Sequence, residues 1–123
     1  MTKAPAAMPK ALTIGAVVWT VTADPIDWLR IENSTQCRGA YGHTEPMMAT
    51  IYISPDTSPD NQRLTLWHEL MHALCETVMG SPHWSNLGEN PTEREERVVR
   101  AFESPTLLVL RDNPQLVAYL TGR

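Results

Sequence analysis

Two histidines and one glutamate within five consecutive residues are the part of this sequence best suited to chemistry, in the run His68-Glu69-Leu70-Met71-His72. Residues four apart on an α-helix lie about 40° apart around its axis, one turn above each other. His68 and His72 can therefore each offer one ring nitrogen to the same metal ion. Glu69 is displaced by about 100°, so it cannot easily be a ligand beside both histidines, but it can reach a water held at the metal. Zinc accepts such a pair, and a carboxylate beside an activated water can act as general base. The pattern predicts a hydrolase site with Zn²⁺ as cofactor.

A third zinc ligand must come from another part of the chain, because a catalytic zinc usually has three protein ligands and one open position. The regions that supply candidates are the acidic run over residues 93–96 and the loop that holds His83. Within the acidic run, Glu93 already has an adequate role as a helix-capping residue, three positions after Asn90.

The apolar residues of the helix expected to begin at residue 90, here called the second helix, indicate which of the remaining glutamates faces the core. Val98, Val99 and Phe102 define its buried face. Glu95 lies three and four residues before the two valines and therefore points toward the core, whereas Glu96 shares the face of Val99 only. We predict Glu95 as the third ligand, with Glu96 and the loop histidine as alternatives.

Cys75 lies three residues after His72 and therefore near the metal face of the helix. As a fourth ligand it would make the zinc structural. A free cysteine in a helix is more often a small packed apolar residue, which is the role that we expect. Cys37 is the other of only two cysteines, and so low a number favours a reducing, cytoplasmic setting.

The histidine pair falls in the middle of a helix predicted over residues 59–79. Ser58 suits the N-cap and Pro59 the first helical position, while Gly80 followed by Pro82 predicts the end. Apolar residues recur at helical spacing at Leu64, Trp67, Met71, Leu74 and Val78.

Strands are expected mainly before this helix. Residues 11–21 are rich in β-branched side chains and predict one strand, residues 39–43 predict a short strand or turn, and residues 48–53 predict a further strand. They indicate a short, partly antiparallel sheet.

Further helices are expected mainly after the histidines. One begins at Asn90-Pro91, and two short ones are predicted over residues 106–111 and 115–120, each preceded by a capping residue and a proline. A short helix over residues 24–31 is also predicted. Strands first and helices after predict an α+β fold, with the sheet packed on the helix that carries the histidines.

The bulk composition limits the classes of function. The chain has 123 residues and a net charge of −4, and we expect a flexible tail over residues 1–9 followed by a single domain over residues 10–123. The negative charge argues against a protein that binds nucleic acid through a general positive field. No apolar run approaches the roughly 20 residues needed to span a bilayer, so no membrane partner is expected.

The run Gln62–Leu74 resembles the active-site helix of the zincin-like metallopeptidases, and more narrowly that of the ImmA/IrrE group and its small phage-encoded members. A strand over residues 50–53 comes shortly before it, and the glutamate-rich start of a helix over residues 93–99 comes about 20 residues after the second histidine. The ending over residues 110–120 also resembles that of the phage-type members. The Glu-x-x-Ala-Asn and Leu-Leu-Met-Pro runs typical of the group are absent.

The resemblance implies a zincin-like domain whose small sheet has an edge strand able to pair with an extended substrate. It also implies His68 and His72 as zinc ligands, Glu69 as base and a glutamate of the second helix as third ligand. Relatives cleave repressor proteins, so the expected partner is a protein or peptide substrate in a bacterial cell or a phage-infected host. No helix-turn-helix pattern accompanies the domain.

Two functions are therefore considered. The first is a zinc endopeptidase that acts on a repressor or another regulatory protein, with residues 51–53 pairing with the substrate backbone. Tyr52, Arg97 and Tyr119 are its candidates for stabilising an oxyanion. The alternative is a catalytically inactive binding module on a zincin fold, either a virion component or a protein that interacts with the host.

Overall fold

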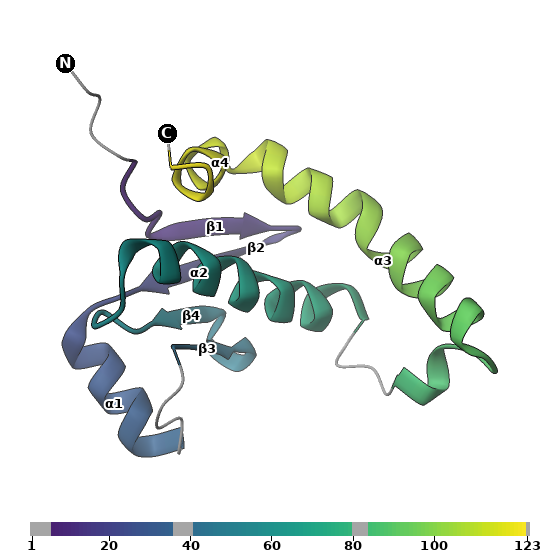
Figure 1. Cartoon of the computed structure of the whole chain (residues 1–123), viewed down its shortest axis with the longest axis horizontal. Coiled ribbons are helices and arrows are strands. Elements are labelled where there is room, and N and C mark those ends of the chain that lie inside the picture. The colour runs from purple at the N-terminus through teal and green to yellow at the C-terminus, as the bar shows by residue number, and fades with distance from the viewer. Residues whose placement is uncertain (1–5, 36–40, 80–83, 123) are drawn as a thin grey trace.

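A four-stranded mixed sheet forms the centre of the molecule (Figure 1). The computed structural model describes residues 6–35, 41–79 and 84–122. The strand order is β1-β2-β4-β3, with β1 antiparallel to β2, β2 parallel to β4, and β3 antiparallel to β4. The expected partly antiparallel sheet is confirmed. The strands are β1 (Ala11–Ile14), β2 (Val17–Thr22), β3 (Gly42–Glu45) and β4 (Thr50–Ile53).

The first two strands correct an expectation, because residues 11–21 form a hairpin and not one strand. Gly15 lies at the turn with a φ of +61°, in the left-handed region that favours glycine. The β-branched side chains on both sides of Gly15 gave a continuous strand pattern and hid the turn. The second strand of the hairpin then pairs with β4 in parallel.

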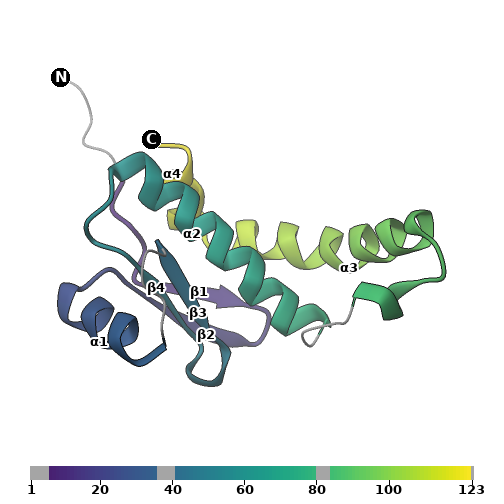
Figure 2. The ribbon, with the colours of Figure 1, turned by 60° about the horizontal axis from the view of Figure 1, so that its bottom comes forward.

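Helices cover both faces of the sheet (Figure 2). α1 (Pro25–Thr35) is preceded by Asp24, whose Oδ1 accepts hydrogen bonds from the backbone N–H groups of Ile26 and Asp27. α2 (Pro59–Leu74) begins at Ser58 and continues into a π-helical turn, η2 (Cys75–Met79). Gly80 and Pro82, which predict the end of this helix, lie outside the described residues. The short 3₁₀ helices are η1 (Pro46–Met48) and η3 (Trp84–Leu87).

The long helix α3 (Pro91–Asp112) corrects a second expectation, because it runs through Pro105 without the break predicted there. A proline inside a helix removes one backbone hydrogen bond and costs about 3 kcal/mol. Packing opposes that cost, since Val109 is 2% exposed and Phe102 packs against the main core. The expected helix start at Asn90 is confirmed, with its side chain accepting from the Glu93 N–H at 2.9 Å.

Asn113 separates α3 from the last helix, α4 (Pro114–Leu120), and links both to the sheet. Asn113 is 1% exposed, and its side chain does not cap α4. It accepts from the Thr13 N–H and donates to the carbonyls of Thr13 and Val109, each at 2.8 Å. These bonds fix the end of α3 against β1, and buried polar groups need such partners.

The main core lies between the sheet and α2. Leu66, Leu70 and Leu74 of α2 are each 0% exposed and belong to the same buried cluster as Ile51 and Ile53 of β4. This packing fixes the orientation of α2 relative to the sheet, and therefore the positions of the polar residues on its other faces. Within the described residues, no helix has both the length and the apolar character needed to cross a bilayer.

Candidate metal centre on α2

The three residues of the histidine motif lie in the second half of α2, with His72 in its last turn. Because η2 continues the helical path to Met79, the motif lies inside the helical segment that the sequence predicts. Local signals place the helix there: Pro59 occupies its first turn, and the Ser58 side chain accepts from the Asn61 N–H at 3.2 Å. His68 and His72 are exposed, whereas Glu69 is 6% exposed. The helix therefore presents two imidazoles to solvent and turns the carboxylate between them toward the sheet.

The distances within this group fit a metal ion. His68 Nε2 and His72 Nε2 lie 3.2 Å apart, and one ligand atom from each of the three residues lies within 4.8 Å of the others. Two nitrogens bound to one tetrahedral zinc at about 2.0–2.1 Å are themselves separated by about 3.3 Å. The two Nε2 atoms are thus already at the separation that a shared zinc requires.

The residues that hold Glu69 come from β3. Thr44 Oγ1 lies 3.1 Å from the Glu69 carbonyl oxygen and 3.4 Å from Glu69 Oε2, so its hydroxyl can donate to either. Gly42 lies on the same face of β3, and because it has no side chain, β3 and α2 can approach each other closely. A Cβ atom added there would lie 2.6 Å from Thr65 Cγ2 and 2.9 Å from Glu69 Cγ.

Sequence interpretation did not identify Gly42 or Thr44. A glycine inside a strand marks a close approach of another part of the protein, and that signal was available in the segment 39–43. Thr44 carries no such signal, because its partner lies 25 residues away in the sequence.

A cavity of about 270 Å³ lies between β3 and α2, and we call it the site cavity. Two residues of the histidine motif, His68 and Glu69, are part of its lining. The lining residues are Tyr41, Gly42, Leu64, Thr65, His68 and Glu69.

The free edge of the sheet borders this cavity. Among the described residues, β3 pairs only with β4, in a register that sets Gly42 opposite Ile53 and Thr44 opposite Ile51. The Ser54 N–H donates to the Tyr41 carbonyl at 2.8 Å. Because hydrogen-bonded pairs alternate along an antiparallel ladder, the backbone groups of Gly42 and Thr44 face away from β4. The expectation that residues 51–53 pair with a substrate is wrong, since β4 is bonded to β2 on one side and β3 on the other.

The candidates for a third ligand that the structure describes lie outside the group on α2. Glu95 is exposed near the start of α3, and Val99 on the same stripe is 51% exposed, so the expectation that Glu95 points toward the core is wrong. The Glu96 carboxylate accepts from Arg100 Nε at 2.8 Å. Glu93 Oε2 accepts from the Glu89 N–H at 2.8 Å, one residue before the N-cap. The remaining candidate, His83, falls outside the described residues.

Cys75 is half-buried and is not part of the group that could hold a metal within the described residues. Burial raises the pKa of its thiol, and the charge of Glu76 raises it further. A thiol with a raised pKa is less readily converted to the thiolate that binds zinc. The other cysteine, Cys37, lies outside the described residues.

The expected candidates for stabilising an oxyanion, Tyr52, Arg97 and Tyr119, do not line the site cavity. Tyr52 packs with Trp28 and Ile31 on the sheet face opposite α2. The Arg63 guanidinium lies over the Tyr119 ring, 5.7 Å from its centroid. Burial raises the pKa of the Tyr119 hydroxyl, and the charge of Arg63 partly offsets this effect.

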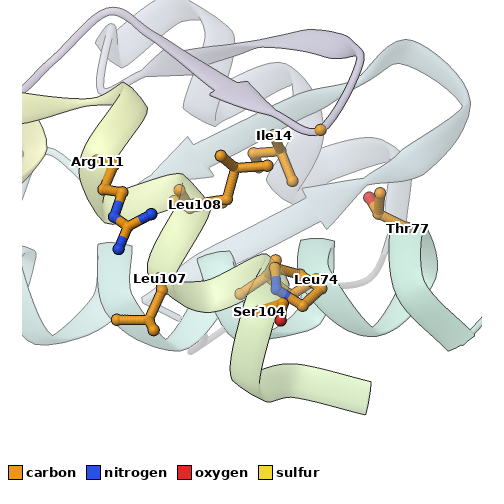
Figure 3. Close-up of a pocket in the computed structure, with 10 residues that line it drawn as sticks. Ile14, Leu74, Thr77, Ser104, Leu107, Leu108 and Arg111 are labelled. Atoms are coloured by element: carbon orange, nitrogen blue, oxygen red, sulfur yellow. The ribbon is translucent and has the colours of Figure 1, made fainter. Parts of the chain in front are cut away.

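A separate apolar cavity of about 690 Å³ lies between the β1–β2 hairpin, the end of α2 and the second half of α3 (Figure 3). Leu74 of α2 lines this cavity. Leu74 and His72 are two positions apart, and side chains two positions apart on a helix point in nearly opposite directions. This cavity is therefore on the other side of α2 from the histidines.

Comparison with known proteins agrees with this geometry. A family model described as Peptidase_M78, IrrE N-terminal-like domain, matches residues 28–115, which include all of α2 and all of α3. A search of curated proteins and a search of solved structures each return no match. The small α+β fold with its four-stranded mixed sheet is consistent with a zincin-like domain of this kind. Because the match covers well over half of its length, the chain belongs to the Peptidase_M78 (IrrE N-terminal-like) family.

Proposed function

We propose that this protein is a zinc-dependent endopeptidase in which His68 and His72 bind the metal and Glu69 is the general base. Family membership and the His-Glu-His group together support a metallopeptidase in general. The observation that carries the specific proposal is the 3.2 Å separation of the two Nε2 atoms, with the Glu69 carboxylate beside them.

The chemistry divides between the metal and the carboxylate. A bound zinc supplies Lewis-acid activation of water and of the peptide carbonyl. Glu69 accepts a proton from the attacking water and returns it to the nitrogen of the leaving amine. Its burial, together with the Thr44 hydroxyl 3.4 Å from Oε2, limits the positions open to the carboxylate, so proton transfer begins from a restricted geometry.

We propose Glu95 as the third ligand, with Glu96 and His83 as alternatives. Glu95 is not within the group on α2, so its carboxylate would have to come closer to the two histidines in order to bind the same metal. The hydrogen bond from Arg100 engages Glu96 along its own helix. This bond would have to break before Glu96 could bind a metal, which favours Glu95.

The proposed substrate is an extended segment of a repressor or another regulatory protein. The outward backbone groups of Gly42 and Thr44 on β3 can pair with an added strand. Such a strand would lie over the site cavity and beside His68.

The alternative function is a catalytically inactive binding module on the same fold. Exposure of Glu95 and its position outside the group on α2 favour this alternative. The peptidase needs a bound zinc for activity, whereas the binding module does not.

Metal analysis tests the proposal. Purified protein is expected to bind one zinc per chain by mass spectrometry of the metal, and to cleave a fluorescently labelled casein. Removal of zinc by a chelator should abolish cleavage, and added zinc should restore it.

His68→Ala and His72→Ala should each lose the metal. Glu95→Gln should weaken zinc binding roughly 10-fold or more, whereas Glu96→Gln should not. A folded protein that takes up no zinc would support the binding module.

The hydrogen bond from Thr44 gives a second test of the mechanism. Thr44→Val removes the donor to Glu69 while keeping the shape of the side chain, and it should lower kcat about 10-fold with little change in KM or zinc content. Thr44→Ser keeps the hydroxyl and should restore most of kcat. A merely structural role would give parallel losses in both variants, or a change in melting temperature without a specific fall in kcat.

A further inference from the structure

An apolar cavity of about 460 Å³ lies where α2, α3 and α4 meet, and we call it the three-helix cavity. Its volume falls within the range of about 300–1,000 Å³ that is typical of ligand sites. Its walls come mainly from large apolar side chains on three different elements. They are Leu64 and Trp67 of α2, Leu110 of α3, and Val117 and Leu120 of α4.

Leu64 connects this cavity to the candidate metal centre. It lines both the three-helix cavity and the site cavity. It also stands four residues before His68, so the two side chains share one stripe of α2 and lie about one turn, or about 6 Å, apart along the axis. Leu64 is 67% exposed and Val117 is 38% exposed, so part of the apolar lining is open to solvent, and Leu64 extends that open surface to the site cavity.

The charges around the three-helix cavity select an uncharged ligand. Arg63 lies at its edge, but the guanidinium is already engaged: Nη1 lies 2.8 Å from Asp60 Oδ1, and Nε donates to the Tyr119 carbonyl at 3.2 Å. An acidic side chain would have to compete with these partners. An aliphatic or aromatic side chain would instead gain by leaving water for the apolar walls.

We propose that the three-helix cavity binds a large apolar side chain of the peptide substrate, two or three residues from the scissile bond. The inference rests on the proposed function, because the position is defined relative to a metal held by the two histidines. An extended chain advances about 3.3 Å per residue, so about two residues span the turn between His68 and Leu64. Substrates are thereby expected to carry leucine, methionine or an aromatic residue at one fixed position.

Peptide hydroxamates provide a probe whose position is fixed by zinc, because the hydroxamate group binds the metal directly. Two series of alanine tripeptides are compared, one with the hydroxamate at the N-terminal end and one at the C-terminal end. In each series, one residue at a time is leucine or aspartate. Calorimetry on the zinc-loaded protein should find one position at which leucine binds about 10-fold to 100-fold tighter than aspartate.

Variants of the lining test whether the cavity causes this preference. Leu64→Gln and Val117→Thr make the walls polar without adding a charge or a metal ligand, and each should reduce the preference to less than about threefold. Leu29→Gln is the matched control. Leu29 is a helix leucine that is 57% exposed on α1 and does not line the cavity, so this variant should keep the full preference.

The outcomes separate the two proposals. Equal binding of all side chains, or a preference that survives both lining variants, overturns the assignment of the cavity. A preference for leucine without hydrolysis of any peptide supports the cavity and contradicts the peptidase. A protein that takes up no zinc overturns both, and the metal content, measured first, identifies that cause.

Discussion

Replacing Glu69 with glutamine is expected to lower kcat/KM by about 10²-fold to 10⁴-fold while zinc stays bound at His68 and His72. The amide has the size of the carboxylate but cannot accept a proton from water. The Thr44 hydroxyl can still donate to its oxygen, so the buried position beneath β3 should remain filled. The loss should therefore appear in the chemical step and not in folding.

The measurement is hydrolysis of labelled casein by wild type and variant, together with zinc content and melting temperature. Glu103→Gln makes the same chemical change on an exposed part of α3 and should leave all three quantities near those of wild type. Full activity in Glu69→Gln would show that another group takes the proton. Loss of zinc would show that Glu69 is itself a ligand.

The candidate metal site on α2 could be foreseen because everything that defines it is local. The Ser58 cap and Pro59 start the helix, and the four-residue spacing then places both imidazoles on one stripe. No contact with a distant part of the chain is needed for this result. The 3.2 Å between the two Nε2 atoms follows from helix geometry and one choice of side-chain rotamers.

The features that the sequence did not reveal depend on contacts between distant residues. The Asn113 side chain bonds the backbone of Thr13, 100 residues away, although the local pattern indicates only a helix cap. The helix continues through Pro105 because its second half is packed against the sheet, and the dipeptide Ser104-Pro105 alone favours a break. Local propensity is a weak guide wherever packing opposes it.

Gly42→Ala is expected to lower both stability and activity, although alanine is usually the better residue in folded backbone. The added Cβ would stand 2.6 Å from Thr65 Cγ2, 2.9 Å from Glu69 Cγ and 3.1 Å from the Tyr52 carbonyl oxygen. The last of these is backbone of the paired strand, so the methyl group cannot move that way. Overpacking of this kind costs about 1–3 kcal/mol.

The same displacement reaches the chemistry, because one of the crowded atoms belongs to Glu69. If β3 moves away from α2, the Thr44 hydroxyl moves with it and the carboxylate loses its fixed position. We expect kcat/KM to fall at least about 10-fold, since small misplacements of a catalytic group have effects of up to about 10²-fold. Chemical denaturation and casein hydrolysis measure the two losses on the same preparation.

A second substitution shows whether the clash is the cause. Thr65→Ser removes the Cγ2 atom that lies nearest to the added methyl group and keeps the hydroxyl. In the Gly42→Ala background it should recover part of both the free energy of unfolding and the activity. The coupling between the two changes is expected to be about 0.5–3 kcal/mol, as for residues in direct contact. If Gly42→Ala alone behaves like wild type, β3 and α2 do not approach as closely as this site requires. The glycine would then have no part in holding Glu69.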